Sequence, residues 1–317
     1  MLIGRSDALA RMVELLEKFA RCNAPVLIEG ETGTGKEVAA RYVHYHSSRT
    51  SGPFVPVNCG AIPDNLFENE FFGHEKGAFT DARTSGAGYV TLADGGTLFL
   101  DEIDSLSGKG QVALLRFLQD RTYRRLGGSC ECRADVRVIA AANTDLESLA
   151  DRNAFRRDLL FRIKLLFIKL TPLRRRIEDI PILAEHFVDE CSREYGIAQK
   201  RLAPEAIAWL ELQPWPGNVR ELENLMHRAF LLTEAHQISV AALGGSAAID
   251  LTINDQGSSY RAAKAHAVEQ FHRRYLTELL RAVHGNVSRA ARRCGTDRRA
   301  FGRLLKRYNV PPAQFRA

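Results

Sequence analysis

Apolar residues gather in five short runs within the first 170 positions, and segments of helical period separate them. The gaps between neighbouring runs are long enough to hold a helix, which is typical of a parallel sheet with helices on its faces. The sequence therefore predicts an α/β fold built on a parallel sheet. The predicted strands are Pro25–Glu29, Phe54–Asn58, Thr97–Asp101, Arg137–Ala142 and Leu165–Leu170.

After Pro172 the pattern changes to amphipathic helix, with helices predicted at Ile177–Tyr195, Pro204–Leu212 and Asn218–Thr233. Residues 241–259 are small, polar and nearly uncharged, as in a linker. We therefore predict four segments along the chain: an α/β subdomain over 1–170, a helical lid subdomain over 171–240, the linker over 241–259, and a small all-helical domain over 260–317.

The composition is that of an ordinary globular protein, with 45% hydrophobic and 26% charged residues among 317. No apolar run reaches the roughly 18 residues that cross a membrane, and the first residues lack a secretory pattern. The six cysteines are scattered, and the closest pair, Cys130 and Cys132, does not have a zinc-binding spacing. We therefore expect a cytoplasmic protein with reduced thiols and no membrane partner.

The net charge of +6 is unevenly divided along the chain. Residues 260–317 hold 14 basic and 3 acidic side chains, whereas the remaining 259 residues hold 30 basic and 35 acidic ones. A strongly basic tail on a mildly acidic body predicts that nucleic-acid binding is confined to the tail.

A glycine-rich segment joins the first predicted strand to a predicted helix over Val38–His46. Its residues are Gly30, Glu31, Thr32, Gly33, Thr34, Gly35, Lys36 and Glu37. Strand, glycine loop and helix in this order predict a P-loop, in which backbone N–H groups, the helix N-terminus and the lysine ammonium bind nucleotide phosphates. The expected cofactors are ATP and Mg²⁺. Glu37 stands where the general pattern has the hydroxyl that ligates Mg²⁺.

The third predicted strand ends in two carboxylates, Asp101 and Glu102. A site that hydrolyses ATP needs a carboxylate that holds Mg²⁺ through water and a base that polarises the attacking water. We predict the first role for Asp101 and the second for Glu102.

The basic tail contains three helical patterns, over residues 261–283, Val287–Cys294 and Asp297–Tyr308. The last two are joined through Gly295 and predict a helix-turn-helix whose second helix enters the major groove of double-stranded DNA. The preceding apolar helix would pair two tails, so we expect a palindromic site; the alternative is a basic helical hairpin that contacts protein. The candidate DNA contacts are Thr296, Arg298, Arg299 and Arg303.

Several stretches of the sequence resemble one family, the AAA+ ATPase activators of sigma-54 RNA polymerase. The resemblance covers the chain from about Ile3 to Thr233 and resumes over 285–293, which is similar to the Fis-type domain of these activators. The stretches that carry it in the body are Gly30–Glu37, Phe71–Thr80, Gly95–Ile103, Phe155–Arg162, Thr171–Ile180 and Trp215–Asn224.

The resemblance implies roles for several polar residues. Arg156 and Arg162 are similar to the family's arginine fingers, which reach the γ-phosphate of a neighbouring subunit and therefore require a ring, in this family a hexamer. Arg220 lies in a segment similar to the sensor II helix and would contact the bound nucleotide from the lid.

Two asparagines at strand ends also match family positions. Asn58 looks like the switch residue that restrains Glu102. Asn143 matches the sensor I position, but Ala142 precedes it where the family usually has a threonine that could take part in sensing the γ-phosphate.

The resemblance further implies a contact with sigma-54 through the loop Gly77, Ala78, Phe79, Thr80, Asp81 and Ala82. Phe79 and Thr80, the contacting pair in the family, are both present. Asp81 stands where the family normally has a glycine, and this exchange adds a charge and restricts the backbone.

These features predict an enhancer-binding activator that binds upstream DNA, assembles from dimers to a hexameric ring, and uses ATP hydrolysis to remodel the closed complex of sigma-54 RNA polymerase. Two alternatives stay open. One is a DNA-binding regulator that ATP controls without remodelling, which Asp81 and Ala142 favour; the other is an unrelated AAA+ machine such as a helicase loader or unfoldase. Because the sequence begins almost directly at the AAA+ domain, without an N-terminal regulatory domain, we expect a separate regulatory protein, or a shortened or naturally short form.

Overall fold

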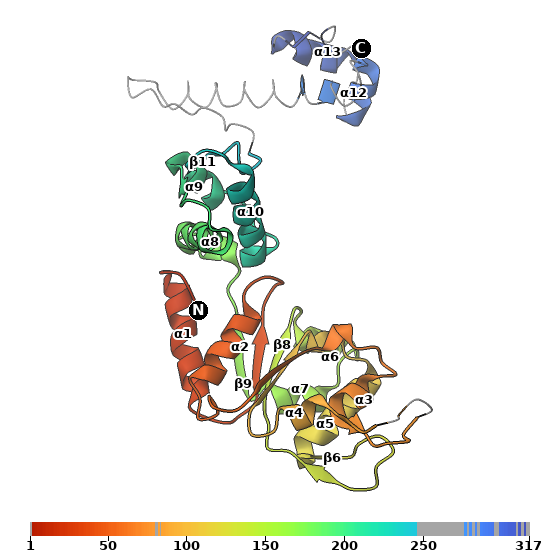
Figure 1. Cartoon of the computed structure of the whole chain (residues 1–317). Coiled ribbons are helices and arrows are strands. Elements are labelled where there is room, and N and C mark those ends of the chain that lie inside the picture. The colour runs from red at the N-terminus through yellow and green to blue at the C-terminus, as the bar shows by residue number, and fades with distance from the viewer. Residues whose placement is uncertain are drawn as a thin grey trace. The chain divides into compact units, whose positions relative to one another are not determined.

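The computed structural model describes residues 2–79, 82 and 84–245, and in the C-terminal part residues 276–277, 279–280, 283, 286–294, 298–308, 310–311 and 314. The chain divides into two compact units, Met1–Leu243 and Gly244–Ala317. The first unit contains a layered α/β part followed by a helical lid, and the described residues of the second include two short helices (Figure 1).

Five parallel strands form the central sheet in the order β2-β5-β8-β1-β9 (Figure 1). They are β1 (Val26–Glu29), β2 (Phe54–Asn58), β5 (Thr97–Asp101), β8 (Arg137–Ala142) and β9 (Leu166–Lys169). Each lies within one residue of a predicted strand, so the predicted α/β fold is confirmed.

Successive strand residues pack on opposite faces of the sheet, as the pleat requires. Ile28, Phe99 and Ile139 pack with α1 (Asp7–Ala20) and α2 (Lys36–Tyr45) on one face. Leu27, Leu98, Leu100 and Val138 pack against helices of the other face. These helices are α3 (Phe67–Phe72), α4 (Tyr89–Leu92), α5 (Gly108–Asp120), α6 (Leu146–Asp151) and α7 (Arg157–Ile163).

Several short elements were not predicted, because two or three residues give no periodic signal. They are the 3₁₀ turns η1 (Cys59–Ala61) and η2 (Ile103–Ser105), and two hairpins of β3 (Gly73–His74) with β4 (Gly86–Ala87) and of β6 (Thr122–Tyr123) with β7 (Cys132–Arg133). The thiols of Cys130 and Cys132 lie in the second hairpin and are not joined in a disulfide.

The lid contains three helices around its own apolar core, which includes Phe187, Trp215 and Phe230. Its helices agree with the predicted ones to within two residues at each end. The elements are η3 (Leu173–Arg175), α8 (Asp179–Tyr195), β10 (Arg201–Leu202), α9 (Pro204–Glu211), α10 (Asn218–Leu232) and β11 (Gln237–Ile238).

A buried carboxylate, Asp179, ties the start of the chain to the lid. Its Oδ1 accepts the backbone N–H groups of Arg5 at 2.7 Å and of Ser6 at 2.8 Å, and its Oδ2 accepts the Ser6 hydroxyl at 2.8 Å. The guanidinium of Arg176, also buried, lies 3.8 Å from Oδ2. Asp179 therefore satisfies donors that would otherwise be buried without partners.

The C-terminal unit contains α12 (Val287–Arg293) and α13 (Arg298–Arg307). The Asn286 side chain caps α12 by accepting the N–H of Arg289 at 3.1 Å. The predicted apolar positions meet in one small core, formed by Leu276, Leu280, Val283, Ala290, Ala291, Phe301, Leu305, Tyr308 and Val310. Most of the predicted helix over 261–283, most of the linker and Thr296 lie outside the described residues.

Among the described helices, none has the length and apolar composition needed to cross a bilayer.

We expect Asp179→Ala to lower the free energy of unfolding by about 3–5 kcal/mol, because it removes one partner of a buried ion pair and leaves three donors unpaired. Chemical denaturation of the purified protein measures the change. The matched control is Glu178→Ala at the exposed neighbouring position, which should change stability by less than about 0.5 kcal/mol. Equal effects of the two substitutions would contradict the role assigned to Asp179.

Candidate functional site

The glycine-rich segment forms a loop between β1 and α2, as predicted. Gly35 is the residue before α2 and has φ +97°, in the left-handed region that favours glycine. The turn places Lys36 at the first position of the helix. Loop N–H groups and the helix N-terminus lie at the same place, and this arrangement suits an anion such as a phosphate.

The Lys36 side chain is buried and turned back over the loop. Its Nζ donates to the carbonyl oxygens of Gly30 at 2.8 Å and Glu31 at 3.1 Å, and to Oδ1 of Asn143 at 2.7 Å. Burial lowers the pKa of the ammonium, and the nearby carboxylates, Asp101 first among them, oppose that shift. The positive charge is therefore held beside a group of carboxylates at one edge of the sheet.

Strand register explains why these groups meet. Asn58 on β2 lies beside Asp101 on β5, and Glu29 on β1 lies beside Ala142 on β8. The residues that follow these strands leave the same edge of the sheet, where parallel α/β folds bind their ligands. The predicted P-loop, Asp101, Glu102 and Asn143 are thereby brought together from separate parts of the sequence.

Asp101 is half-buried, and burial raises the pKa of its carboxyl, against the opposing effects of the Glu102 N–H and of Lys36. Its Oδ1 accepts that N–H at 2.9 Å. A cation bound beside a half-buried carboxylate stabilises its charged form. Among the described residues, no three or more His, Cys, Asp or Glu side chains are grouped as possible metal ligands. Mg²⁺ is commonly held by one or two carboxylates together with water and substrate phosphates, and Asp101 offers one such carboxylate.

Glu102 has a strained backbone, with φ 54° and ψ 43°. A left-handed backbone conformation costs free energy in residues other than glycine, and such residues are concentrated at functional sites. A Cβ built on Gly60 would lie 2.7 Å from Oε2 of Glu102 and 3.3 Å from Oδ1 of Asn58, so the two side chains are neighbours. Within the described part of the chain, no donor bonds to the Glu102 carboxylate, which leaves it available to a water molecule.

Asn58 caps η1 in this structure. Its Oδ1 accepts the N–H groups of Gly60 at 2.9 Å and Ala61 at 3.2 Å. The restraint of Glu102 by Asn58 stays a prediction.

Asp104 is a further acidic residue at this edge of the sheet and was not predicted from the sequence. Its Oδ2 accepts the Thr144 hydroxyl at 2.9 Å, and its Oδ1 lies 3.4 Å from the N–H of Asn143. It therefore positions the residues that follow β8, and its charge also acts on Lys36. The available signal was a third acidic residue shortly after Asp101.

The lid supplies a further wall. A cavity of about 210 Å³ is lined by P-loop, strand-end and lid residues: Thr32, Gly33, Gly35, Lys36, Glu37, Val38, Asp101, Glu102, Asn143, Val219, Arg220 and Glu223. The predicted sensor II residue, Arg220, thus faces the same space as Lys36 and Asp101. Glu37, which stands at the position of the usual hydroxyl ligand, is paired with Arg41 at 2.7 Å. The Thr34 hydroxyl donates to the carbonyl of Glu31.

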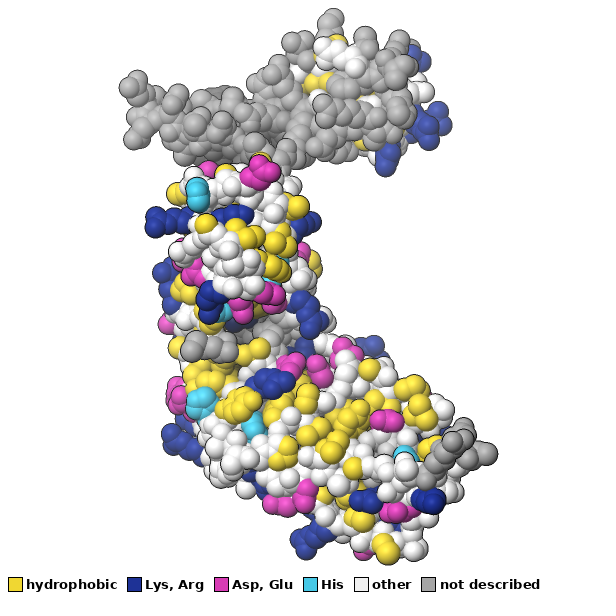
Figure 2. Space-filling view, viewed as in Figure 1, with side chains coloured by type: hydrophobic (Ala, Val, Ile, Leu, Met, Phe, Trp, Pro, Cys, Tyr) yellow, Lys and Arg dark blue, Asp and Glu magenta, His cyan; other side chains and the backbone are white. Residues whose placement is uncertain are grey.

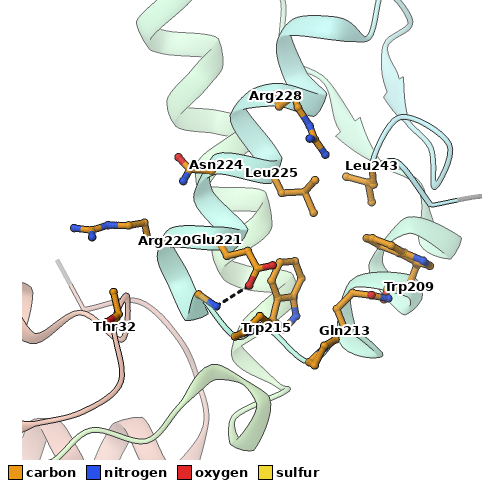
Figure 3. A pocket seen from close by; sticks show the side chains of 13 residues that line it. Thr32, Trp209, Gln213, Trp215, Arg220, Glu221, Asn224, Leu225, Arg228 and Leu243 are labelled. Carbon is orange, nitrogen blue, oxygen red and sulfur yellow. Dashed lines mark hydrogen bonds between the residues drawn. The ribbon is translucent and has the colours of Figure 1, made fainter. Parts of the chain in front are cut away.

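A second cavity, of about 730 Å³, adjoins the first and shares Thr32 and Arg220 with it. Figure 3 shows Arg220 extending to the side of Thr32, away from Trp209 and Trp215, while Arg228 points toward Leu243. The dashed line marks the bond from the N–H of Gly217 to Glu221, which is 2.8 Å long. Arg220 therefore belongs with the smaller, charged cavity.

The two predicted arginine fingers do not line either of these cavities. Arg156 is the residue before α7, is exposed, and donates two hydrogen bonds to Asp158, at 3.0 and 2.7 Å. Arg162 donates to the carbonyl oxygens of Leu118 and Gln119 at the end of α5.

The predicted sigma-54 loop projects between β3 and β4. Its described residues are Gly77, Ala78, Phe79 and Ala82; Thr80 and Asp81 lie outside the described residues. The N–H of Gly77 donates to Ala82 and that of Ala82 to Phe79, each at 2.9 Å, which closes the loop. Phe79 is 45% exposed, with its ring 5.0 Å from that of His74. A large aromatic side chain is therefore presented on a closed loop.

On the C-terminal unit, Arg298 and Arg303 of α13 are exposed, as are Arg289, Arg292 and Arg293 of α12. Some of the described arginine side chains of this unit are visible at its surface in Figure 2. Arg299 belongs to α13, but its side chain is outside the described part.

Comparison with known protein families matches three consecutive segments. A sigma-54 interaction domain matches residues 2–169, an AAA+ ATPase lid domain matches 174–253, and the bacterial regulatory protein, Fis family, matches 267–308.

Similar proteins cover nearly the whole chain. Nitrogen fixation protein AnfA of Azotobacter vinelandii is 40% identical over 99% of this chain, and the DNA-binding transcriptional regulator NtrC of Rhizobium meliloti is 38% identical over 98%. The chain spans 58% of the length of AnfA and 70% of NtrC. The crystal structure of NtrX from Brucella abortus in complex with ATP has a TM-score of 0.73 and 32% identity, over 98% of this chain and 70% of NtrX.

The parallel sheet, P-loop, strand-end carboxylates and helical lid define a P-loop NTPase fold of the AAA+ class. The chain belongs to the family of proteins with a sigma-54 interaction domain, here followed by a Fis-type helix-turn-helix.

We expect Glu102→Gln to lower the turnover of ATP by about 10²–10⁴-fold, because the amide cannot accept a proton from the attacking water. Nucleotide affinity should change little, since Lys36, Asp101 and Arg220 are retained. Phosphate release and fluorescent-nucleotide binding measure the two quantities. Glu68→Gln, on the exposed surface of α3, is the control; normal turnover by the Glu102 variant would exclude this residue as the base.

Proposed function

We propose that the chain is a bacterial enhancer-binding transcriptional activator. It binds DNA upstream of a promoter through its C-terminal unit and hydrolyses ATP in a ring of AAA+ domains. The hydrolysis drives remodelling of the closed complex of sigma-54 RNA polymerase in the cytoplasm.

The charged cavity supports the ATPase part of the proposal. Lys36 and Arg220 would contact the phosphates, Asp101 would hold Mg²⁺ through water, and Glu102 would polarise the attacking water. Asn143, which accepts a hydrogen bond from Lys36, would respond to the γ-phosphate because it touches the group that binds it. The similar NtrX structure is a complex with ATP, which supports the choice of nucleotide.

The positions of Arg156 and Arg162 support a ring. A transferred phosphoryl group needs a cation that offsets its spreading charge, yet neither arginine lines the cavity around Lys36. Each would therefore act on the nucleotide of a neighbouring subunit, as part of a hexamer that dimers assemble.

The exposed Phe79 loop supports sigma-54 contact, together with the family match over this segment. Arg298, Arg299 and Arg303, with Thr296 as the cap of their helix, would read an upstream DNA site, and two paired tails would favour a palindromic one. The observation that carries the proposal is the presence, on one chain, of the charged P-loop cavity, the Phe79 loop and the basic helix-turn-helix.

Transcription from a sigma-54 promoter with purified protein and ATP tests the remodelling step. We expect open complexes to form with the wild-type chain, and Phe79→Ala to abolish them while leaving ATP turnover within twofold. If the wild-type chain forms none and Asp81→Gly restores them, the chain is instead a DNA-binding regulator that ATP controls without remodelling, the candidate that Asp81 and Ala142 favour.

Lys36→Ala tests whether the ATPase and DNA-binding units are independent. We expect it to lower ATP turnover by about 10²–10³-fold, because a fixed cation at the phosphates is lost. DNA affinity, measured by mobility shift, should stay within twofold. Lys18→Ala, on the exposed face of α1, is the control, and loss of DNA binding by a folded Lys36 variant would contradict the independence.

A further inference from the structure

The second residue of the P-loop, Glu31, does not face the cavity around Lys36. Its carboxylate bonds twice to Arg174 of η3, at 2.6 and 2.5 Å, and accepts the side-chain amide of Asn218 at 3.2 Å. These bonds, with Arg174 as the first cause, lower the pKa of the carboxyl to about 2. The Glu31 carboxylate is therefore ionised at neutral pH.

Asn218, the first residue of α10, forms further hydrogen bonds between the lid and the P-loop. Its amide also donates to the carbonyl of Thr32 at 3.0 Å, and its Oδ1 accepts the N–H of Leu173 at 2.9 Å. The backbone is held at φ 52°, and the side chain is fully buried. The next residue, Val219, donates its N–H to the carbonyl of Gly33 at 2.9 Å.

Backbone contact at this point is tight. Gly33 has φ +78°, and a Cβ on it would overlap the carbonyl oxygen of Gly217 in the lid. At Gly33 the backbone of the lid therefore lies directly against the backbone of the phosphate-binding loop.

We propose that Glu31 is a positioning residue, which with Arg174 and Asn218 forms a latch that holds the helical lid in a fixed orientation on the P-loop. This role deepens the proposed ATPase function and rests on it. Arg220 is two residues beyond Asn218, and Lys36 is five residues beyond Glu31. The latch thus decides whether the cation from the lid and the cation from the loop reach the same phosphates.

Exposure separates this role from a general contribution to stability. The side chains of Arg174 and Glu31 are 41% and 43% exposed, and exposed ion pairs contribute little to the free energy of folding. A misplacement of about 1 Å in catalytic groups, in contrast, can lower a rate by about 10²-fold. Loss of the pair should therefore be seen in turnover rather than in unfolding.

The test uses Glu31→Ala, Arg174→Ala, the double variant and the exchanged pair Glu31→Arg with Arg174→Glu. We expect each single variant to lower kcat for ATP by about 10- to 100-fold, with the midpoint of unfolding nearly unchanged. The double variant should be no worse than the more impaired single one, and the exchanged pair should recover part of the loss. Single effects that multiply in the double variant, or a kcat within twofold of wild type, would overturn the proposal.

Lys18→Ala is the control. Lys18 pairs with Glu14 at 2.7 Å, and the two side chains are exposed, at 62% and 67%. Both residues belong to α1, so the pair does not join the loop to the lid. Its kcat should stay within twofold of wild type.

Hydrogen exchange in the nucleotide-free chain gives a readout that does not depend on ATP hydrolysis. The Val219 N–H, bonded to Gly33, should exchange roughly tenfold faster in Arg174→Ala than in wild type or in Lys18→Ala. Unchanged exchange would overturn the latch even if the ATPase is active. An inactive wild type with faster exchange in the variant would instead contradict the proposed function and leave the latch supported.

Discussion

Parallel pairing in one register is the constraint on which the rest of the structure depends. β2, β5, β8 and β1 all end at the same edge of the sheet, so the four segments that follow them must share one small volume. The P-loop, the Asp101–Glu102 turn and Asn143 come together for this reason, although more than a hundred residues separate the first from the last. If one strand were shifted by one residue, every side chain of that strand would point to the opposite face of the sheet.

The same edge concentrates charge, and the positive charge of Lys36 is offset there by neighbouring carboxylates. A buried ammonium at Lys36 is costly unless anions lie near it, and Asp101, Glu102 and Asp104 provide them. A nucleotide with Mg²⁺ would supply both the phosphates that Lys36 can bind and the cation that Asp101 can hold. The strained backbone of Glu102 keeps its carboxylate near Gly60, where no described donor neutralises it.

Two carboxylates, Asp179 and Glu31, connect the α/β part to the lid in different ways. Asp179 is fully buried and accepts hydrogen bonds from backbone N–H groups of the N-terminal segment. We therefore expect it to contribute to the free energy of folding. Glu31 is partly exposed and lies on the loop that would hold the phosphates. We therefore expect it to affect the orientation of the lid on that loop more than the free energy of folding. Charge also differs between the acidic body and the basic tail: Lys36 and Arg220 of the body line one cavity, whereas Arg298 and Arg303 of the tail are exposed.

The sequence by itself determined the five strands, the lid helices, the apolar core of the helix-turn-helix and the chemical character of the P-loop and of Asp101–Glu102. These features are local: period, glycine spacing and strand-end carboxylates can be read within a few residues. Only the tertiary structure decided that Glu31 faces the lid, that Asp104 supports Asn143, and that Asn58 caps η1. The short hairpins beside the Phe79 loop also had no periodic signal. Those outcomes depend on which distant backbone lies within hydrogen-bonding distance, and a single sequence does not encode that distance in any local pattern.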